Sequence, residues 1–303
     1  MSIAVIMPCH NAAQWVGRAL RSVAAQDHAP DEVIVIDDAS RDDSATIAAD
    51  TGVPTDILHT AHGNGAAARN SGIAIARSDW VAFLDADDYW RARHLAQAAE
   101  SFGEGDVGYM AQRDVVSVEG EERPVSVPFP VDAPRTGIAA GTFLDWFAGT
   151  SAFYMSATVV RRDRLEEVGR LEPAQKRRHD IDMWLRLIAG QTWSFDPRPT
   201  SVYQLDTPGS ISSALADREL WFLRALVRNR EAYAAHGMDT LIRAAARRAL
   251  SKALTFGEAD ERAAAYAEAL PQLPSGQRAL FRLMRCSPAG YRLLNRLRHG
   301  GRG

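Results

Sequence analysis

Short runs of branched apolar residues recur along the first hundred residues, and helix-like segments separate them. The runs cover residues 3–7, 32–36, 55–58 and 80–84, and each has the length of one buried strand. Helical spacing of apolar residues follows the first run, and Ala-rich or amphipathic segments at 65–76 and 91–102 follow later ones. Strands that alternate with helices in this way build a mostly parallel central sheet flanked by helices on both faces. The expected fold class is therefore α/β.

The rest of the chain is less regular in its middle part and helical towards its end. Strands are expected at 107–118 and 153–161, a loop at 119–134, and helices at 142–147 and 180–189. Pro197, Pro199 and Pro208 indicate a connecting segment, because proline cannot donate to a sheet ladder. From about residue 214 onward, alanine, leucine and arginine dominate. We therefore expect one domain over residues 1–210 and a helical C-terminal region over residues 211–303.

Composition argues against several classes of protein. The formal net charge of −3 disfavours nucleic-acid binding driven by overall charge. Cys9 and Cys286, the two cysteines, lie far apart and form neither a disulfide framework nor a zinc-ligand set. The N-terminus lacks the features of a signal peptide, and no window approaches the roughly 20 apolar residues of a membrane span. We therefore expect a cytoplasmic protein without a nucleic-acid partner.

Polar side chains follow each of the four predicted strands of the first hundred residues. Pro8 and Asn11 follow the first strand, Asp37 and Asp38 the second, Asn64 and Arg69 the third, and Asp85, Asp87 and Asp88 the fourth. Ligands of open parallel sheets bind outside the carboxyl ends of the strands. We therefore expect these groups to converge on one crevice.

Three carboxylates occur within four residues at the end of the fourth strand. Asp85, Asp87 and Asp88 repel one another unless a cation lies between them. Mg²⁺, and Mn²⁺ in similar surroundings, typically takes one or two carboxylates and completes its coordination with substrate phosphates and water. The cluster therefore predicts a divalent metal, Mn²⁺ or Mg²⁺, that bridges to a diphosphate. The alternative is that these acids cap the helix that begins near Arg91.

Other patterns at the same edge have alternative interpretations. Asp37-Asp38-Ala39-Ser40 is also a good turn sequence, and Arg69 can be an ordinary surface cation. Residues 63–68, GNGAAA, fit the dinucleotide fingerprint G-x-G-x-x-A, which would indicate an oxidoreductase. No glycine directly follows the first strand, however, and the acids at 87 and 88 oppose an unbridged pyrophosphate. We expect instead that Gly65 opens a helix that presents Arg69 to the crevice.

Taken together, these stretches resemble the family 2 glycosyltransferases, nucleotide-sugar transferases of bacterial type with the GT-A fold. The resemblance is carried, in the family's order across residues 1–205, by AVIMPCHNAAQWVGRALRSVAAQ, EVIVIDDASRDDS, GNGAAARNSGIAIARSDWVAFLDADDYW, SATVVRRDRLEEVG and HDIDMWLRL. It implies an inverting enzyme that transfers a sugar from a nucleotide-diphosphate sugar, with a UDP-sugar as the first candidate. It also implies a glycan or lipid-linked acceptor and a role in cell-surface polysaccharide synthesis.

The resemblance implies roles for individual residues as well. Residues similar to the family's base and ribose contacts are Pro8, Asn11, Asp37 and Asp38, with Asp38 the better candidate for the base. Asp85-Ala86-Asp87 is similar to the DxD motif, with Asp87 the better metal ligand and Asp85 nearer the ribose. Nucleotide-sugar contacts are also expected at Asn64 and Arg69.

The catalytic carboxylate of such enzymes belongs to an "ED" pair at a helix start, which here is His179-Asp180. The resemblance thus implies that Asp180 is the general base, while His179 replaces the usual Glu. Asp182 is a competitor, and only one of the two acids is expected to face the site. Thr150 and Ser151 resemble the acceptor side of the family more weakly. A non-catalytic nucleotide-sugar binding module is the alternative, in which the change at His179 signals lost activity.

The C-terminal tail has an unusual charge pattern. From residue 278 onward its Lys, Arg, Asp and Glu positions are all arginine, namely Arg278, Arg282, Arg285, Arg292, Arg296, Arg298 and Arg302. Apolar residues between them have helical spacing, and such a helix can lie on an anionic membrane surface. The tail therefore predicts a peripheral contact at the inner face of the cytoplasmic membrane. A solvated helix packed on the transferase domain is the alternative.

Overall fold

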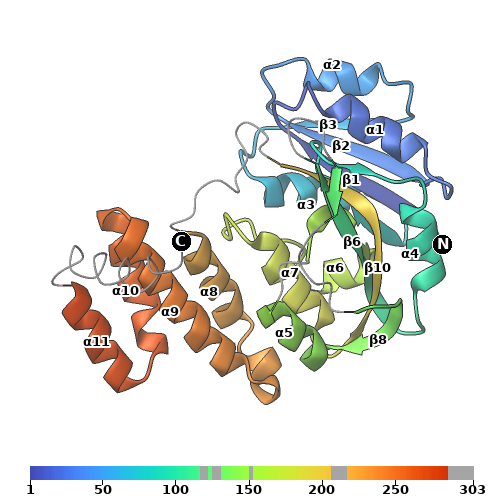
Figure 1. Ribbon diagram of the computed structural model, residues 1–303. Coiled ribbons are helices and arrows are strands. Elements are labelled where there is room, and N and C mark those ends of the chain that lie inside the picture. The colour runs from blue at the N-terminus through green and yellow to red at the C-terminus, as the bar shows by residue number, and fades with distance from the viewer. Residues whose placement is uncertain (117–121, 125–130, 150–152, 206–216, 286–303) are drawn as a thin grey trace. The chain divides into compact units, whose positions relative to one another are not determined.

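The computed structural model describes residues 1–116, 122–124, 131–149, 153–205 and 217–285 (Figure 1). The contacts within the chain divide it into two compact units. Unit 1 comprises residues 1–174 and 183–209, and unit 2 comprises residues 175–182 and 210–303. Residues 175–182, which the sequence assigned to the first domain, thus group with the C-terminal part. Whether the two units are separate domains stays a prediction.

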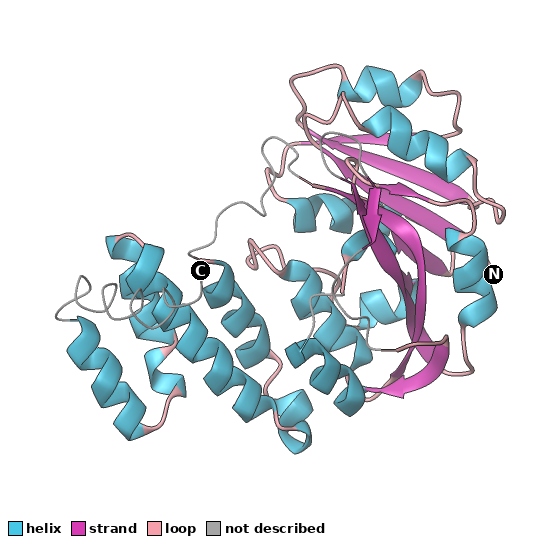
Figure 2. Ribbon diagram, viewed as in Figure 1, coloured by secondary structure: helices cyan, strands magenta, loops and turns pink. Residues whose placement is uncertain are grey.

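Unit 1 is built around one ten-stranded sheet (Figure 2). The strands are β1 Ile3–Cys9, β2 Glu32–Asp38, β3 Asp56–Thr60, β4 Trp80–Phe83, β5 Tyr89–Trp90, β6 Asp106–Val116, β7 Glu122–Pro124, β8 Arg135–Ala139, β9 Thr158–Arg161 and β10 Thr192–Gln204. Their order is β3-β2-β1-β4-β9-β6-β10-β5, with β7 paired to β6 and β8 to β10. β3, β2, β1, β4, β6 and β10 run in one direction, because β9 is antiparallel to both β4 and β6. The expected α/β fold with a mostly parallel sheet is confirmed.

Helices cover both faces of this sheet. They are α1 Val16–Ala24, α2 Ser44–Ala49, α3 Gly65–Ile75, α4 His94–Ser101, α5 Ala140–Gly149, α6 Arg162–Glu167 and α7 His179–Ile188, with a 3₁₀ turn η1 Met155–Ala157. Alternate residues of a strand point to opposite faces. Ile3, Val5 and Met7 of β1 therefore belong to the core shared with α1, α2 and α4. On the other face α3 packs so closely that a Cβ at Gly72 would lie 2.7 Å from Cδ1 of Ile36.

All the regular elements in the described part of unit 2 are helices. Its elements are the start of α7, α8 Arg218–Arg228, η3 Glu231–His236, α9 Met238–Phe256, α10 Ala259–Glu268, η4 Leu270–Gln272 and α11 Ser275–Arg285. The buried residues of α9 include Leu241, Ile242, Leu250 and Leu254, which recur with helical spacing on one face. Among the described residues, no helix combines the length and the apolar composition that a bilayer crossing requires.

Three expectations for the middle of the chain were wrong. The segment with Pro197 and Pro199 is part of the long strand β10, and its register shifts on either side of Pro199. Proline is tolerated there because a bulge interrupts the ladder of hydrogen bonds. Residues 153–161 form a strand only from Thr158 onward, because η1 precedes it. The expected loop at 119–134 contains the short strand β7.

Candidate active site

The carboxyl ends of β1 to β4 lie at one edge of the sheet and are joined by hydrogen bonds. The Nδ1 atom of His10 lies 2.7 Å from the carbonyl oxygen of Asp38, and the amide of Asn11 donates to Oγ of Ser40 over 3.0 Å. Asn11 and Ala39 both have positive φ angles, 50° and 59°. Backbone conformations of this kind cluster at functional sites. At the sheet edge predicted from the sequence, two residues therefore have uncommon backbone conformations, and hydrogen bonds join the neighbouring strand ends.

Asp38 organises the loop that follows β3. Its carboxylate accepts hydrogen bonds from Oγ1 of Thr60 (2.9 Å) and from the amides of His62 (2.5 Å) and Asn64 (3.1 Å). Burial by itself raises the pKa of Asp38, but these hydrogen bonds outweigh burial and hold the pKa below its usual value. The charged carboxylate thus fixes the turn at 60–64. A contact with a nucleotide base stays a prediction for this residue.

Asp37 and Asn11 hold the neighbouring turn after β2. Asp37 accepts a hydrogen bond from the amide of Ser40 (3.3 Å), and its other oxygen lies 3.0 Å from Nδ1 of His59. The side-chain oxygen of Asn11 accepts from the amide of Arg41 over 2.8 Å. Pro8 pairs with Ile36 inside the sheet, just before this turn. These residues shape the surface of the turn, and their contact with a ligand stays a prediction.

Asn64 is the N-cap of α3. Its side-chain oxygen accepts from the amides of Ala66 (2.9 Å) and Ala67 (3.2 Å), and its Nδ2 donates to the carbonyl of Pro173 over 2.8 Å. A dinucleotide pyrophosphate would need the same free amides at the helix start. The structure therefore disfavours the oxidoreductase interpretation of GNGAAA and gives Asn64 a capping function that the sequence did not predict.

Arg69 reaches the acidic strand end, as expected. Its side chain is 8% exposed, donates to the carbonyl of Gly65 over 2.9 Å, and forms an ion pair with Oδ1 of Asp85. The interpretation of Arg69 as a surface cation is thus wrong. The guanidinium fixes one oxygen of Asp85 and adds positive charge next to the acidic cluster.

Asp85, Asp87 and Asp88 form the candidate metal site. Each offers one carboxylate oxygen, and these oxygens lie within 4.8 Å of one another. A hard divalent cation takes oxygen ligands, so this set of donors fits Mn²⁺ or Mg²⁺. Asp85 and Asp87 are partly exposed, whereas Asp88 is fully buried. The capping alternative is wrong, because the N-cap of α4 is Arg93 and no side chain caps that helix.

Asp88 connects three parts of unit 1. Its carboxyl group accepts from the amide of Gln204 (3.1 Å), from Oγ of Ser156 (2.5 Å) and from the hydroxyl of Tyr154. Burial, together with the charges of Asp87 and Asp85, raises the pKa of Asp88 well above its usual range, against the opposing effect of these hydroxyls. Asp88 thus ties the turn after β4 to the end of β10 and to η1, which the sequence did not predict.

Arg18 supports the same turn from α1. Its Nη2 donates to the carbonyl oxygen of Asp87 over 2.8 Å, and both terminal nitrogens lie 3.1 Å from Oε1 of Gln204. Its guanidinium also lies 4.5 Å from the ring centre of Tyr89. Arg18 therefore fixes the backbone at the residue expected to bind metal. Arg18 lies within the first stretch that carries the family resemblance, but no function was predicted for it from the sequence.

Asp180 and Asp182 lie at the start of α7 and belong to unit 2. Asp180 is partly exposed, and its Oδ1 accepts from the amide of Ile181 over 2.8 Å. Asp182 is fully buried and lies 3.2 Å from Nδ2 of Asn229 and 3.5 Å from Nε of Arg228. Asp182 therefore has a structural environment, and Asp180 is the accessible acid of the two. Its catalytic function, and that of the neighbouring His179, stay predictions.

Two other expected regions fall outside the described residues. These are the acceptor-side residues Thr150 and Ser151 and the arginine-rich tail from residue 286 onward, which includes Cys286. Cys9 is buried at the end of β1, where burial raises the pKa of its thiol to about 12. It is therefore protonated at neutral pH and does not supply a thiolate to the site.

Comparison with known proteins decides the family. The sequence profile described as "Glycosyl transferase family 2" matches residues 4–169. The chain belongs to this family. A family relative, "Succinoglycan biosynthesis protein ExoU" of Rhizobium meliloti, is 32% identical over 58% of this chain and 48% of its own length. The chain spans about half the length of the curated relatives that it matches.

Solved structures show the fold of this family 2 chain. S. aureus TarS 1–349, in complex with UDP-GlcNAc, aligns with a TM-score of 0.71 and 20% identity, over 99% of this chain and 92% of that chain. The mannosyltransferase PcManGT from Pyrobaculum calidifontis, in complex with GDP-Man and Mn²⁺, aligns with a TM-score of 0.54 and 18% identity, over 97% and 87% of the two chains. The fold is therefore of the GT-A type, as the resemblance implied.

Proposed function

We propose that the protein is an inverting glycosyltransferase that uses a nucleotide-diphosphate sugar and a divalent metal. The observation that carries this proposal is the carboxylate cluster at the end of β4, held by Arg69 at the same sheet edge as Asp37 and Asp38. Membership of the family supports it. The bound UDP-GlcNAc and GDP-Man of the two structural neighbours support a nucleotide-sugar donor, and a UDP-sugar is our first candidate.

In the proposed site, Asp87 and the remaining oxygen of Asp85 would hold Mn²⁺ or Mg²⁺. When bound, the metal would neutralise the charge of the leaving diphosphate. Pro8, Asn11, Asp37 and Asp38 would border the nucleoside, and Asn64 and Arg69 would shape the donor side through the contacts described above. Arg18 and Asp88 keep the turn at 85–88 in place through the hydrogen bonds described above.

The transfer itself needs a base. The acceptor hydroxyl forms a bond to the anomeric carbon as the bond from that carbon to the diphosphate breaks, so the hydroxyl proton must leave. Asp180 would accept this proton, and attack opposite the leaving group would invert the configuration. We propose a glycan or lipid-linked acceptor and a function in cell-surface polysaccharide synthesis in the cytoplasm, at the inner face of the membrane. The name of the succinoglycan relative supports this polysaccharide assignment.

Thermal unfolding with nucleotides tests the donor site. Nucleoside diphosphates and nucleotide sugars, each with and without Mn²⁺, should raise the melting temperature only when metal and one nucleotide are both present. A ligand at a hundred times its Kd stabilises the native state by about 2.7 kcal/mol. Asp87→Asn should abolish the shift, whereas Asp56→Asn, at an exposed acid of β3, should retain it. No shift with any nucleotide, or an unchanged shift in Asp87→Asn, would contradict the proposal.

Turnover separates an enzyme from a binding module. NMR of the donor with purified protein and metal should show hydrolysis or transfer, and the first product should carry the inverted anomeric configuration. Metal-dependent binding without any turnover would instead support a non-catalytic nucleotide-sugar binding module.

A further inference from the structure

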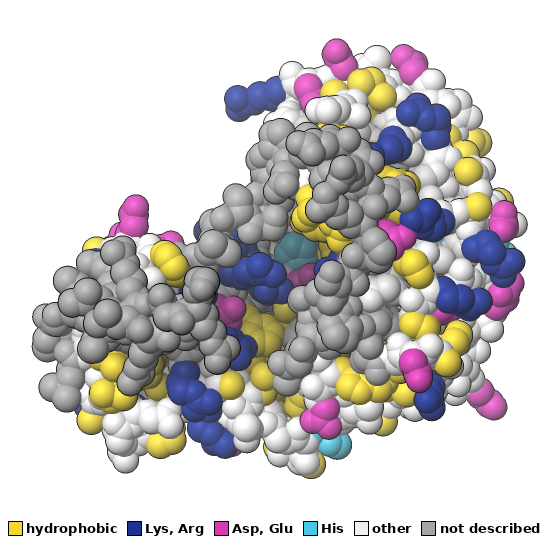
Figure 3. Space-filling view, viewed as in Figure 1, with side chains coloured by type: hydrophobic (Ala, Val, Ile, Leu, Met, Phe, Trp, Pro, Cys, Tyr) yellow, Lys and Arg dark blue, Asp and Glu magenta, His cyan; other side chains and the backbone are white. Residues whose placement is uncertain are grey.

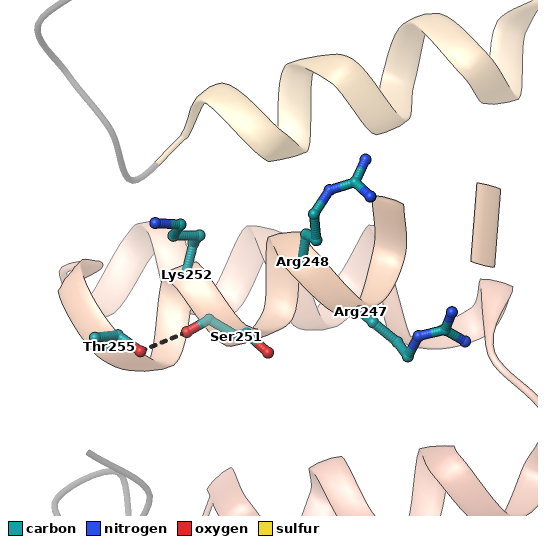
Figure 4. A pocket seen from close by; sticks show the side chains of 5 residues that line it. All are labelled: Arg247, Arg248, Ser251, Lys252 and Thr255. Atoms are coloured by element: carbon teal, nitrogen blue, oxygen red, sulfur yellow. Dashed lines mark hydrogen bonds between the residues drawn. The ribbon is translucent and has the colours of Figure 1, made fainter. Parts of the chain in front are cut away.

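A groove on α9 of unit 2 is lined by basic and hydroxyl side chains. Its lining residues are Arg247, Arg248, Ser251, Lys252 and Thr255, and it has a volume of about 200 Å³ (Figure 4). Arg248 and Lys252 extend from one side of the helix, whereas Arg247 extends in another direction (Figure 4). We call these five residues the α9 groove. None of these residues belongs to the carboxylate cluster of unit 1.

The charge pattern of α9 costs the helix stability. From Arg243 to its end at Phe256 all the charged side chains of α9 are positive, and Arg248 and Lys252 stand four residues apart. Like charges at this spacing destabilise a helix by a few tenths of a kcal/mol, at about 0.2–0.5 per pair. This part of α9 therefore carries a row of positive charges. On the face of the molecule shown in Figure 3, Lys and Arg side chains lie among acidic and apolar ones.

Two cations of the α9 groove have no acidic partner among the described residues. Arg248 forms an ion pair with Glu219 of α8 at 3.0 Å. Arg247 lies 3.4 Å from Oε1 of Gln277 on α11, and Lys252 lies 5.2 Å from the ring centre of Phe256. The groove thus retains positive charge that an anion can neutralise.

Apolar side chains lie next to these cations. Phe256 and Leu280 are 61% and 50% exposed, the highest values among large apolar residues in the described part of the chain. The ammonium group of Lys252 lies over the ring of Phe256. Leu280 follows Gln277 by three positions and therefore shares its face of α11. An anionic group with an apolar attachment is complementary to this combination.

We propose that the α9 groove binds the phosphate headgroup of an anionic membrane lipid. Arg247 and Ser251, which lie four residues apart on one face of α9, would contact the phosphate of one headgroup. Lys252 would contact a neighbouring headgroup, and Phe256 and Leu280 would face the apolar part of the bilayer. This contact is distinct from the one expected of the arginine-rich tail. It also does not depend on the donor chemistry, because no residue of the carboxylate cluster takes part.

Vesicle binding of the full chain tests this proposal. Phosphatidylcholine vesicles with and without phosphatidic acid are compared in EDTA, so that no metal at the carboxylate cluster contributes. The protein should bind only the vesicles with phosphatidic acid. Arg247→Gln or Lys252→Gln should each weaken partitioning about fivefold, as expected for one basic residue near an anionic surface. Phe256→Ser should weaken it as well.

Arg243→Gln is the matched control, since Arg243 lies one turn earlier on α9, outside the groove, and contacts Thr240. It should bind like the unchanged protein, and melting curves should show that every variant is folded. Equal binding to both kinds of vesicle, or equal losses in Arg243→Gln and Arg247→Gln, would overturn the proposal. Saturable binding of inorganic pyrophosphate without vesicle binding would also overturn it, in favour of a soluble phosphate ligand.

Discussion

Asp180 and Asp182 are two residues apart on α7, but their surroundings differ. Asp182 is fully buried beside Arg228 and Asn229, whereas Asp180 is partly exposed and has the amide of Ile181 as its hydrogen-bond donor. A general base must be reachable by substrate, and a buried, paired carboxylate mainly supports the fold. Substitution of Asp180 is therefore expected to change the transfer rate, and substitution of Asp182 is expected to change the stability.

Asp180→Asn should leave donor binding intact and lower the transfer rate by about 10²–10⁴-fold, the usual contribution of a general base. Asp182→Asn should instead lower the melting temperature, because it leaves the Arg228 guanidinium with a neutral partner. Steady-state kinetics and melting curves of both variants provide the check. Full transfer activity in a folded Asp180→Asn protein would remove Asp180 from the mechanism.

At the scale of elements, the turn after β4 depends on α1, η1 and the end of β10. Arg18 of α1 contacts both the carbonyl of Asp87 and the side chain of Gln204. Hydrogen bonds from a charged group contribute about 1.5–3 kcal/mol. A loss of roughly 1.4 kcal/mol corresponds to a tenfold change in an equilibrium constant.

We therefore expect Arg18→Gln to raise the Mn²⁺ concentration for half-maximal activity by about tenfold, with a smaller effect on kcat at saturating metal. Arg21→Gln is the control, since Arg21 is an exposed cation of the same helix. Metal titrations of the activity of both variants test the expectation. An unchanged metal requirement in Arg18→Gln, or an equal change in Arg21→Gln, would show that Arg18 does not position the metal site.

The sequence predicted those features that depend on neighbouring residues. Apolar runs followed by acids located β2 and β4, and the acids at their ends lie at one sheet edge because the strands are parallel. It did not predict Arg18 or Gln204, whose contact joins residues 186 positions apart. It also misassigned the segment around Pro197 and Pro199, because the bulges that admit proline into β10 depend on its pairing with β6. Contacts between residues so far apart leave no pattern among neighbouring residues of the sequence.

At the scale of the whole molecule, the two units carry different chemistry. Unit 1 contains the carboxylate cluster and the strand ends, while unit 2 contains Asp180 and the α9 groove. The stability of unit 1 determines whether the proposed donor side is folded. One buried histidine makes that stability dependent on pH.

His94 is fully buried in the core between α4 and the sheet, where its ring stacks on Trp90 and its Nδ1 lies 2.8 Å from Oγ1 of Thr200. Burial lowers its pKa from 6.5 to about 3, so the folded protein keeps the ring neutral while the unfolded chain takes up a proton below pH 6.5. Stability contributed by this group is therefore complete above the unfolded pKa and decreases as the pH falls towards the folded pKa. Linkage gives a loss of about 2 kcal/mol between pH 7.5 and pH 5.

His94→Leu should flatten the decrease in melting temperature over this range, although it also removes the contact with Thr200 and lowers the melting temperature at neutral pH. His236→Leu, at an exposed histidine of unit 2, should keep the pH dependence of the unchanged protein. Melting curves at a series of pH values measure both. If His94→Leu retained the full decrease, the acid sensitivity of unit 1 would have to come from carboxylates whose pKa the fold lowers, such as Asp38 and Asp196, because His94 would then bind protons equally in the folded and unfolded states.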